Sequence, residues 1–259
     1  MEVHHHSHHP KKWKEYITEF LMLFLAVTLG FFAENVREHQ IERHREIRYL
    51  QNIHQDLIKN ISNLDTTISY IDKRQLLADS LFDHIKNDKI STDLSSYYYF
   101  IKNLSFRRMF VNSEDGFIQL KTSGGLRLIE NNEILSKIQD YTNNMITALE
   151  LQSANELAGQ KFQDINAQIL NVVTSVEMNE AQYVPSKNAN GSTRRFLKPV
   201  NPLPLLTSDK KIINEQYNII FNIINRNKYI KTRFVNLKKE SIELDELIMK
   251  EFGKDFNEK

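Results

Sequence analysis

The chain has 259 residues, 41% of them hydrophobic, so it is long enough to bury a substantial core without cross-links. Its 34 lysine and arginine residues nearly balance its 33 aspartate and glutamate residues, which argues against nucleic acid as a partner. The absence of cysteine excludes disulfides, thiolate metal sites and cysteine nucleophiles.

Residues 1–12 form a histidine-rich tail, and residues 13–35 are predicted to form a transmembrane helix. The uncharged run 20–33 covers only about 21 Å, less than the ~30 Å hydrocarbon core of a bilayer. Extending the helix from Trp13 to Asn35 gives about 34 Å, which spans the core. Aromatic rings and snorkelling lysines at the first end would anchor it at the interface: Trp13, Tyr16, Lys11, Lys12 and Lys14.

Two other interpretations of this apolar run are a buried core helix and a secretory signal peptide. A signal peptide needs small residues before its cleavage site, but Phe31 and Phe32 stand there. The sequence therefore favours a retained span, with the lipid bilayer as its first partner.

Residues 36–88 are predicted to form a helical stalk, because no glycine or proline occurs between Asn35 and Gly116. Apolar residues recur every seven positions in two columns. The columns are Ile47, His54, Ile61, Ile68, Gln75 and Phe82, and Leu50, Leu57, Leu64, Ile71, Ala78 and Ile85. Such a seam packs either against later helices of the same chain or against a second copy, and the intramolecular interpretation is the safer one.

The same register, continued backwards, reaches into the predicted span. Ala26 and Gly30 on this side form a small-xxx-small pair, which allows close approach of two membrane helices. We expect span and stalk to be one continuous helix whose seam faces a homo-oligomer partner or another membrane protein. The membrane part of this seam comprises Glu19, Met22, Ala26, Gly30 and Ala33. For Glu19, the alternative is a simple position near the helix start, where the helix dipole favours an anion.

The rest of the chain is predicted to be helical as well. Residues 89–176 form a helical body, in which Ser91 or Thr92 caps a short helix and a long amphipathic helix from Ile134 continues toward Val176. Four prolines make 177–208 an irregular excursion, and 209–259 forms a C-terminal helix. The expected fold is all-α, one N-terminal transmembrane helix that continues into an elongated bundle or coiled-coil stalk.

Two segments carry a resemblance to a known family. The stretch Lys-Lys-Trp-Lys-Glu-Tyr at 11–16 and the run Glu-Phe-Leu-Met-Leu-Phe-Leu-Ala-Val from residue 19 resemble the N-terminal signature of an uncharacterised bacterial family of single-span membrane proteins. Ser-Gly-Gly-Leu-Arg-Leu-Ile at 123–129 resembles its second recurrent segment. The resemblance implies a short tail, one anchor and a helical body, and it transfers no catalytic residue.

No motif predicts an enzyme, a cofactor, a metal site or a small-molecule ligand. His39 and His44 lie on a solvated helix face, and Arg107 with Arg108 is either a phosphate or lipid headgroup contact or an ordinary surface pair. The leading interpretation is therefore a structural or interaction scaffold. The alternatives are a subunit of an ion-coupled or transport complex that uses Glu19, and an extracytoplasmic ligand-sensing bundle.

Basic residues lie on both sides of the predicted span in nearly equal numbers, so the positive-inside rule does not decide the orientation. The short leading tail favours export of the following domain. We therefore expect a single-pass protein of the bacterial inner membrane with a periplasmic body.

Overall fold

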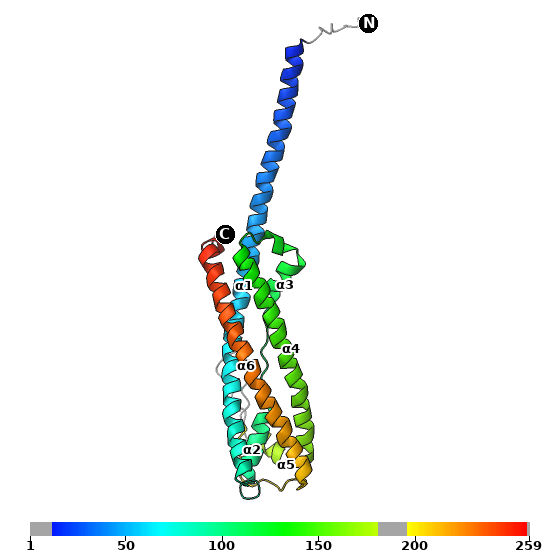
Figure 1. The fold of residues 1–259 in the computed structure, drawn as a ribbon, viewed down its shortest axis with the longest axis vertical. Coiled ribbons are helices and arrows are strands. Elements are labelled where there is room, and N and C mark those ends of the chain that lie inside the picture. The colour runs from blue at the N-terminus through cyan, green and yellow to red at the C-terminus, as the bar shows by residue number, and fades with distance from the viewer. Residues whose placement is uncertain (1–11, 181–195, 258–259) are drawn as a thin grey trace, which may run out of the picture.

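The computed structural model describes residues 12–180 and 196–257, and every regular element within those ranges is a helix. The first helix, α1, runs unbroken from Trp13 to Lys86 over 74 residues, so the predicted span and the predicted stalk belong to one helix (Figure 1). The other elements are α2 (Leu94–Ser105), α3 (Asp115–Thr122), η1 (Gly125–Leu128), α4 (Asn132–Ile169), α5 (Val172–Glu180), α6 (Lys210–Phe252) and η2 (Asp255–Asn257). The predicted all-α fold class is confirmed.

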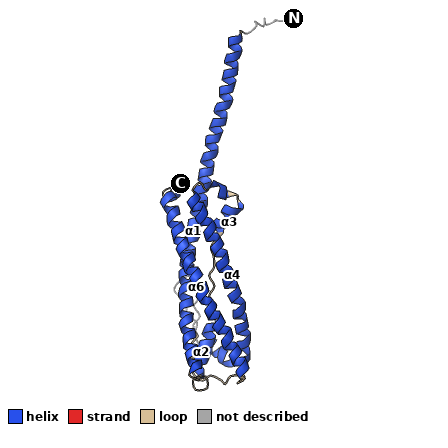
Figure 2. Cartoon of the chain, in the orientation of Figure 1, coloured by secondary structure: helices blue, strands red, loops and turns tan. Residues whose placement is uncertain are grey.

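The bundle has four antiparallel legs, three of which are long helices. The second half of α1 forms the first leg, α4 the third and α6 the fourth, and α6 packs against both α1 and α4. The second leg, residues 94–122, begins with α2 at the end far from the N-terminus and returns to α3 at the near end (Figures 1 and 2). This leg is broken, because residues 106–114 between α2 and α3 are not helical and start with extended backbone at Phe106; we call them the strap.

The length of the second leg explains why it contains the non-helical strap. From Glu46, where α1 enters the bundle, to Lys86 the helix is about 60 Å long at 1.5 Å per residue. Residues 94–122 would cover only about 44 Å as a single helix. Two short helices joined by an extended strap cover about 60 Å, so this shorter leg still reaches from one end of the bundle to the other.

The core consists of two apolar clusters, one near each end of the bundle. The cluster near the N-terminal side joins α1, α3, α4 and α6 around Leu57, Phe117 and Phe234. The distal cluster joins α1, α2, α4, α5 and α6 around Tyr97 and Phe162. Together they hold the four legs in a single packed unit.

A buried polar chain crosses the distal cluster. The Tyr97 hydroxyl donates to Gln216 Oε1, Gln216 Nε2 donates to Asn166 Oδ1 at 2.7 Å, and Asn166 Nδ2 donates to Ser105 Oγ at 2.9 Å. Buried polar groups are costly unless they are paired, and these pairs link α2, α4 and α6 in one register.

The heptad prediction for α1 is correct for one column and wrong for the other. The column from Leu50 to Ala78 is buried, whereas the column that begins at Ile47 is only half-buried. The second buried column is shifted by one residue and is largely polar: Glu46, Ile53, Asn60, Thr67, Arg74 and Leu81. Two of its polar residues, Asn60 and Arg74, bond the strap, whose backbone needs hydrogen-bond partners. Glu46 instead accepts from the backbone N–H of Glu130.

Two predicted boundaries differ from the structure. The short helix α2 is capped by Asp93, which accepts from the backbone N–H of Ser96 at 3.0 Å, and not by Ser91 or Thr92. The long helix α4 ends at Ile169, because Leu170 is extended and Asn171 caps a new helix through Val173 N at 3.0 Å.

The proline-containing excursion, predicted for 177–208, lies between α5 and α6. The predicted start of the excursion at residue 177 is wrong, because α5 continues to Glu180. Residues 181–195 lie outside the described residues, and 196–209 are irregular. Asp209 then caps α6 by accepting from Lys211 N at 2.7 Å.

Candidate functional site

The first candidate site is the N-terminal part of α1, which projects beyond the bundle (Figure 1). It is the one helix in the described residues that is long and apolar enough to cross a membrane, and none of its 18-residue apolar window is buried. A core helix packs most of its apolar surface within its own chain. The exposure of this segment therefore excludes the alternative interpretation of the apolar run as a buried core helix.

The structure leaves the predicted seam open to the surroundings. Met22, Ala26, Gly30 and Ala33 are exposed, and a Cβ added at Gly30 would meet nothing within 4 Å. Glu19 is half-buried on the same helix. The interfacial residues Lys12, Trp13, Lys14 and Tyr16 are exposed around the helix start, and Lys11 lies outside the described residues.

Polar contacts fix α1 where it enters the bundle. The Arg43 guanidinium lies 4.4 Å from the centre of the Phe252 ring, and its Nη1 is 2.7 Å from Glu46 Oε2. Buried Glu46 also accepts from the backbone N–H of Glu130 at 3.0 Å. From Asn35 to Arg43 the exposed helix covers about 12 Å, comparable to a lipid headgroup layer plus a thin layer of water.

The second candidate site is built around the strap, whose backbone is held by side chains instead of a neighbouring strand. Asn60 Oδ1 accepts a hydrogen bond from Ser113 N at 2.7 Å, and Asn60 Nδ2 donates one to Ser113 O at 2.8 Å. Asp56 accepts from Ser113 Oγ at 2.8 Å and from Gly116 N at 2.7 Å. On α4, the Gln152 amide both accepts from Phe110 N at 2.8 Å and donates to Phe110 O at 3.1 Å.

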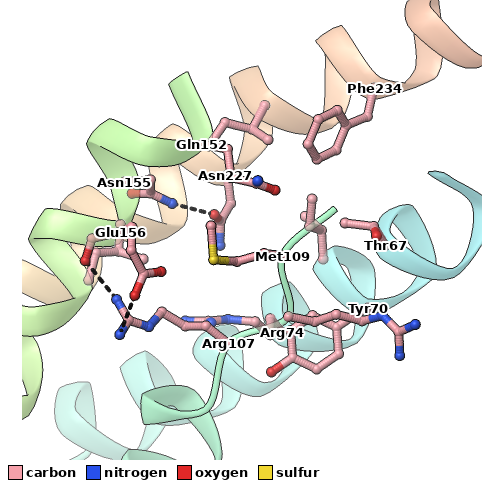
Figure 3. A pocket seen from close by; sticks show the side chains of 14 residues that line it. Thr67, Tyr70, Arg74, Arg107, Met109, Gln152, Asn155, Glu156, Asn227 and Phe234 are labelled. Atoms are coloured by element: carbon pink, nitrogen blue, oxygen red, sulfur yellow. Dashed lines mark hydrogen bonds and ion pairs between the residues drawn. The ribbon is translucent and has the colours of Figure 1, made fainter. Parts of the chain in front are cut away.

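Arginines dominate the distal half of the strap. Arg74 of α1 is buried and donates to the carbonyl oxygens of Leu104 at 2.8 Å and Phe106 at 2.9 Å. The Tyr70 hydroxyl donates to Phe106 O at 2.6 Å. On the other side, Arg107 Nη2 forms an ion pair of 2.8 Å with Glu156 Oε1 (Figure 3).

Gly159 is what permits this position of Arg107. A Cβ at that residue of α4 would lie 1.7 Å from Arg107 Nη1, so any larger residue would displace the guanidinium. Arg107 also donates to the carbonyl of Glu156 at 2.7 Å. The surface-pair interpretation of Arg107 is therefore wrong, because this side chain crosses α4 and is mostly buried.

A small cavity of about 40 Å³ lies between the strap, α1, α4 and α6 (Figure 3). Its lining includes Arg74, Arg107, Arg108 and Asn155. Arg74 Nε and Asn155 Oδ1 are buried without a hydrogen-bond donor or acceptor opposite them among the described residues. The wall of the cavity combines these polar groups with apolar side chains such as Ile71, Met109 and Phe234, and its volume suits only water-sized molecules.

A much larger groove of about 770 Å³ lies between α1, α2 and the strap, and it shares Tyr70, Arg74 and Arg108 with the cavity. We call it the arginine groove. Its lining residues are Asp65, Thr66, Ser69, Tyr70, Lys73, Arg74, Leu77, Tyr99, Asn103, Phe106 and Arg108.

Burial changes the acid–base properties of the two α1 side chains at this groove. It lowers the pKa of Arg74 and raises the pKa of the Tyr70 hydroxyl, which the cationic Arg74 partly offsets. An arginine side chain is not deprotonated in proteins, so Arg74 remains a buried cation, and Tyr70 remains a neutral donor.

The described residues hold no group of three histidine, aspartate or glutamate side chains that could bind a metal ion. His39 and His44 are exposed, and His44 Nδ1 lies 2.6 Å from the Gln40 carbonyl of its own helix. The sequence interpretation missed Arg74, although the polar run Asn60, Thr67 and Arg74 at seven-residue spacing was a usable signal.

Comparison with known proteins finds no matching family model, no similar curated protein and no similar solved structure. The resemblance of the N-terminal segment to a family of single-span membrane proteins therefore stays a prediction. The function has to be argued from the geometry of this chain.

Proposed function

We propose that this chain is a single-span protein of the bacterial inner membrane, with a periplasmic helical bundle that serves as a scaffold for interaction. The observation that carries the proposal is the unbroken helix α1, which joins an exposed apolar segment to the core of the bundle. A hinge would let the body tumble relative to the membrane, whereas one helix holds it at a set height and orientation.

We further propose that the exposed seam pairs two copies of the chain. The stalk part of the seam is already used within the bundle, because Leu50, Leu57 and Leu64 are fully buried there. The membrane part has no such role, since Ala26 and Gly30 are exposed. Small residues at this spacing let two helices approach closely and gain packing and weak hydrogen bonds in lipid.

Cysteine cross-linking in native membranes tests the pairing. Ala26→Cys and Gly30→Cys are expected to give disulfide-linked dimers on mild oxidation, because both lie on the seam. Thr28→Cys is the matched control, since two residues rotate it by about 200° to the opposite face. No dimer at Ala26 and Gly30, or equal dimer at all three positions, would refute a seam-specific pair.

Labelling with an impermeant maleimide in intact cells tests the topology, and the native chain supplies no competing cysteine. Ser80→Cys, on an exposed position of the bundle, is expected to react, and Ser7→Cys in the N-terminal tail is expected to react only after lysis. The reverse pattern would place the bundle in the cytoplasm and contradict the periplasmic assignment while leaving the span intact.

A second candidate function is an extracytoplasmic ligand-binding bundle. The observation that favours it is buried Arg74, which forms no ion pair with any carboxylate of the described residues. A scaffold has no need for an uncompensated buried cation, whereas a receptor for an anion does.

A further inference from the structure

We propose that the arginine groove binds a small, soluble organic anion, with a carboxylate or phosphate group at Arg108 and Lys73 and an apolar part against Tyr99 and Phe106. The groove lies between two helices and an extended segment, and its volume of about 770 Å³ falls within the usual range for small-molecule sites. This inference rests on the second candidate function above, the ligand-binding bundle, and deepens it by naming the class of ligand and the residues that bind it.

The charges around the groove are unbalanced. The groove and the adjoining cavity are lined by four cationic side chains, Lys73, Arg74, Arg107 and Arg108, and by two carboxylates. Both carboxylates are already paired, Asp65 with Lys238 at 2.6 Å and Glu156 with Arg107 at 2.8 Å. Lys73, Arg74 and Arg108 form no ion pair within the described residues, so the floor and walls of the groove carry excess positive charge.

Arg74 supplies charge at the floor of the groove. Its two Nη atoms donate to neutral carbonyl oxygens of the second leg, which satisfy hydrogen bonds but do not cancel the charge. Arg108 and Lys73 are more exposed and have no hydrogen-bond partner of their own in the described residues. Their donors are therefore available for a ligand oxygen, and a guanidinium fork fits both carboxylate and phosphate.

The remaining lining suits the body of an organic anion. Tyr99, Phe106 and Leu77 offer apolar surface, and the Asn103 amide and Ser69 hydroxyl offer polar groups at the sides. A bare inorganic ion would leave this apolar surface unused. An aromatic or short aliphatic anion would bury it, at about 25 cal/mol for each Å² removed from water.

The position of the groove excludes lipid headgroups as the anion, given the proposed span. Arg74 lies about 58 Å beyond Asn35 along α1, at 1.5 Å per residue. Electrostatic interactions at physiological salt fade within about 8 Å. The headgroup alternative for Arg108 therefore falls away, and the ligand has to come from solution.

Isothermal titration calorimetry of the full chain in detergent micelles at 50 mM salt tests this inference. The probes are benzoate, phenyl phosphate and inorganic phosphate. Saturable binding of benzoate or phenyl phosphate is expected, weaker at 500 mM salt, with inorganic phosphate at least about tenfold weaker than the organic probe. Absence of saturable binding by both organic probes up to 10 mM would overturn the site, and equal binding of inorganic phosphate would overturn the role of the apolar wall.

Variants distinguish binding in the groove from non-specific attraction to the positive charge of the chain. Arg108→Gln and Lys73→Gln are each expected to weaken binding about tenfold or more, because each removes a charged hydrogen-bond donor. Arg233→Gln makes the same charge change at an exposed position of α6 outside the groove and is expected to bind like the native chain. Equal loss in all three variants would show non-specific attraction and refute the site.

Arg74→Gln gives a readout that does not depend on direct ligand contact. A glutamine amide keeps N–H donors on this side of α1 but carries no charge. Saturating probe is expected to raise the melting temperature of the native chain but not that of this variant. A variant that folds and is still stabilised by the probe would contradict a role for the buried charge.

Discussion

Asn60→Leu separates two explanations of the polar column on α1. If the column were simply a seam with a misplaced amide, leucine would fill it better and stabilise the bundle by about 1–2 kcal/mol. If the amide holds the strap, leucine has the same branched shape but leaves the strap without its partners. The two explanations predict opposite signs.

The structure sets the size of the effect. Asn60 is fully buried, and the leucine removes all its hydrogen bonds. Asn60 Oδ1 accepts from Ser113 N, and the two N–H groups of Nδ2 are shared among Asn112 Oδ1, Ser113 O and Tyr141 OH. Four partner groups lose their contact with Asn60, and an orphaned buried polar group costs about 1–3 kcal/mol. Because Ser113 is half-buried, the lower part of that range applies, and the four groups together cost about 4 kcal/mol. After subtraction of the gain from leucine, we expect a net loss of about 2 kcal/mol.

Urea unfolding of the full chain in mild detergent, followed by circular dichroism at 222 nm, measures this loss. In a separate thermal unfolding experiment, the melting temperature should fall by about 4–8 °C, at about 2–4 °C per kcal/mol. Asn52→Leu is the control on the same helix, because its amide makes only an exposed hydrogen bond, to Gln119 at 2.7 Å, and should change stability by less than about 0.5 kcal/mol. An Asn60→Leu chain as stable as the native one would refute the role assigned to the polar column.

Three further perturbations have expected outcomes. Gly116→Ala should destabilise the bundle by about 1–3 kcal/mol in the same urea assay, because the new Cβ would lie 2.7 Å from the backbone carbon of Asn52. Gly30→Ala, with open space around it, should not destabilise the bundle. Burial raises the pKa of the Tyr141 hydroxyl to about 12, above its usual value near 10. The unfolded chain then loses that proton first, so stability should fall as pH rises from 10 to 12, and Tyr141→Phe should make this fall shallower in pH-dependent melting curves. Glu19→Gln should leave the yield of the Ala26→Cys dimer unchanged if the chain is a scaffold, whereas loss of the dimer would assign the carboxyl a role in the seam.

The long helices could be predicted because their signals are local. The absence of glycine and proline after Asn35 and the seven-residue spacing from Leu50 onward require no knowledge of the partner. These signals determined the fold class and the continuity of α1.

The strap could not be predicted, because nothing in its own residues requires extension. It contains no glycine or proline and includes Phe106, Met109 and Phe110, which could equally continue a helix. Its conformation depends on the length of the leg that it completes and on donors and acceptors from Asn60, Arg74 and Gln152, far away in the chain. The arginine groove is hidden for the same reason, since its walls come from α1, α2 and the strap.

The charge on Arg74 exceeds what the strap requires. The carbonyls of Leu104 and Phe106 need two N–H donors, and a neutral amide supplies two. Burying a cation without a carboxylate costs several kcal/mol even after relaxation, so Arg74 makes the unliganded bundle less stable than a neutral donor would. An anion in the arginine groove removes that cost without changing a single hydrogen bond of the strap. Stability and ligand binding are therefore coupled through one side chain, and the same helix that carries this side chain also carries the exposed apolar segment.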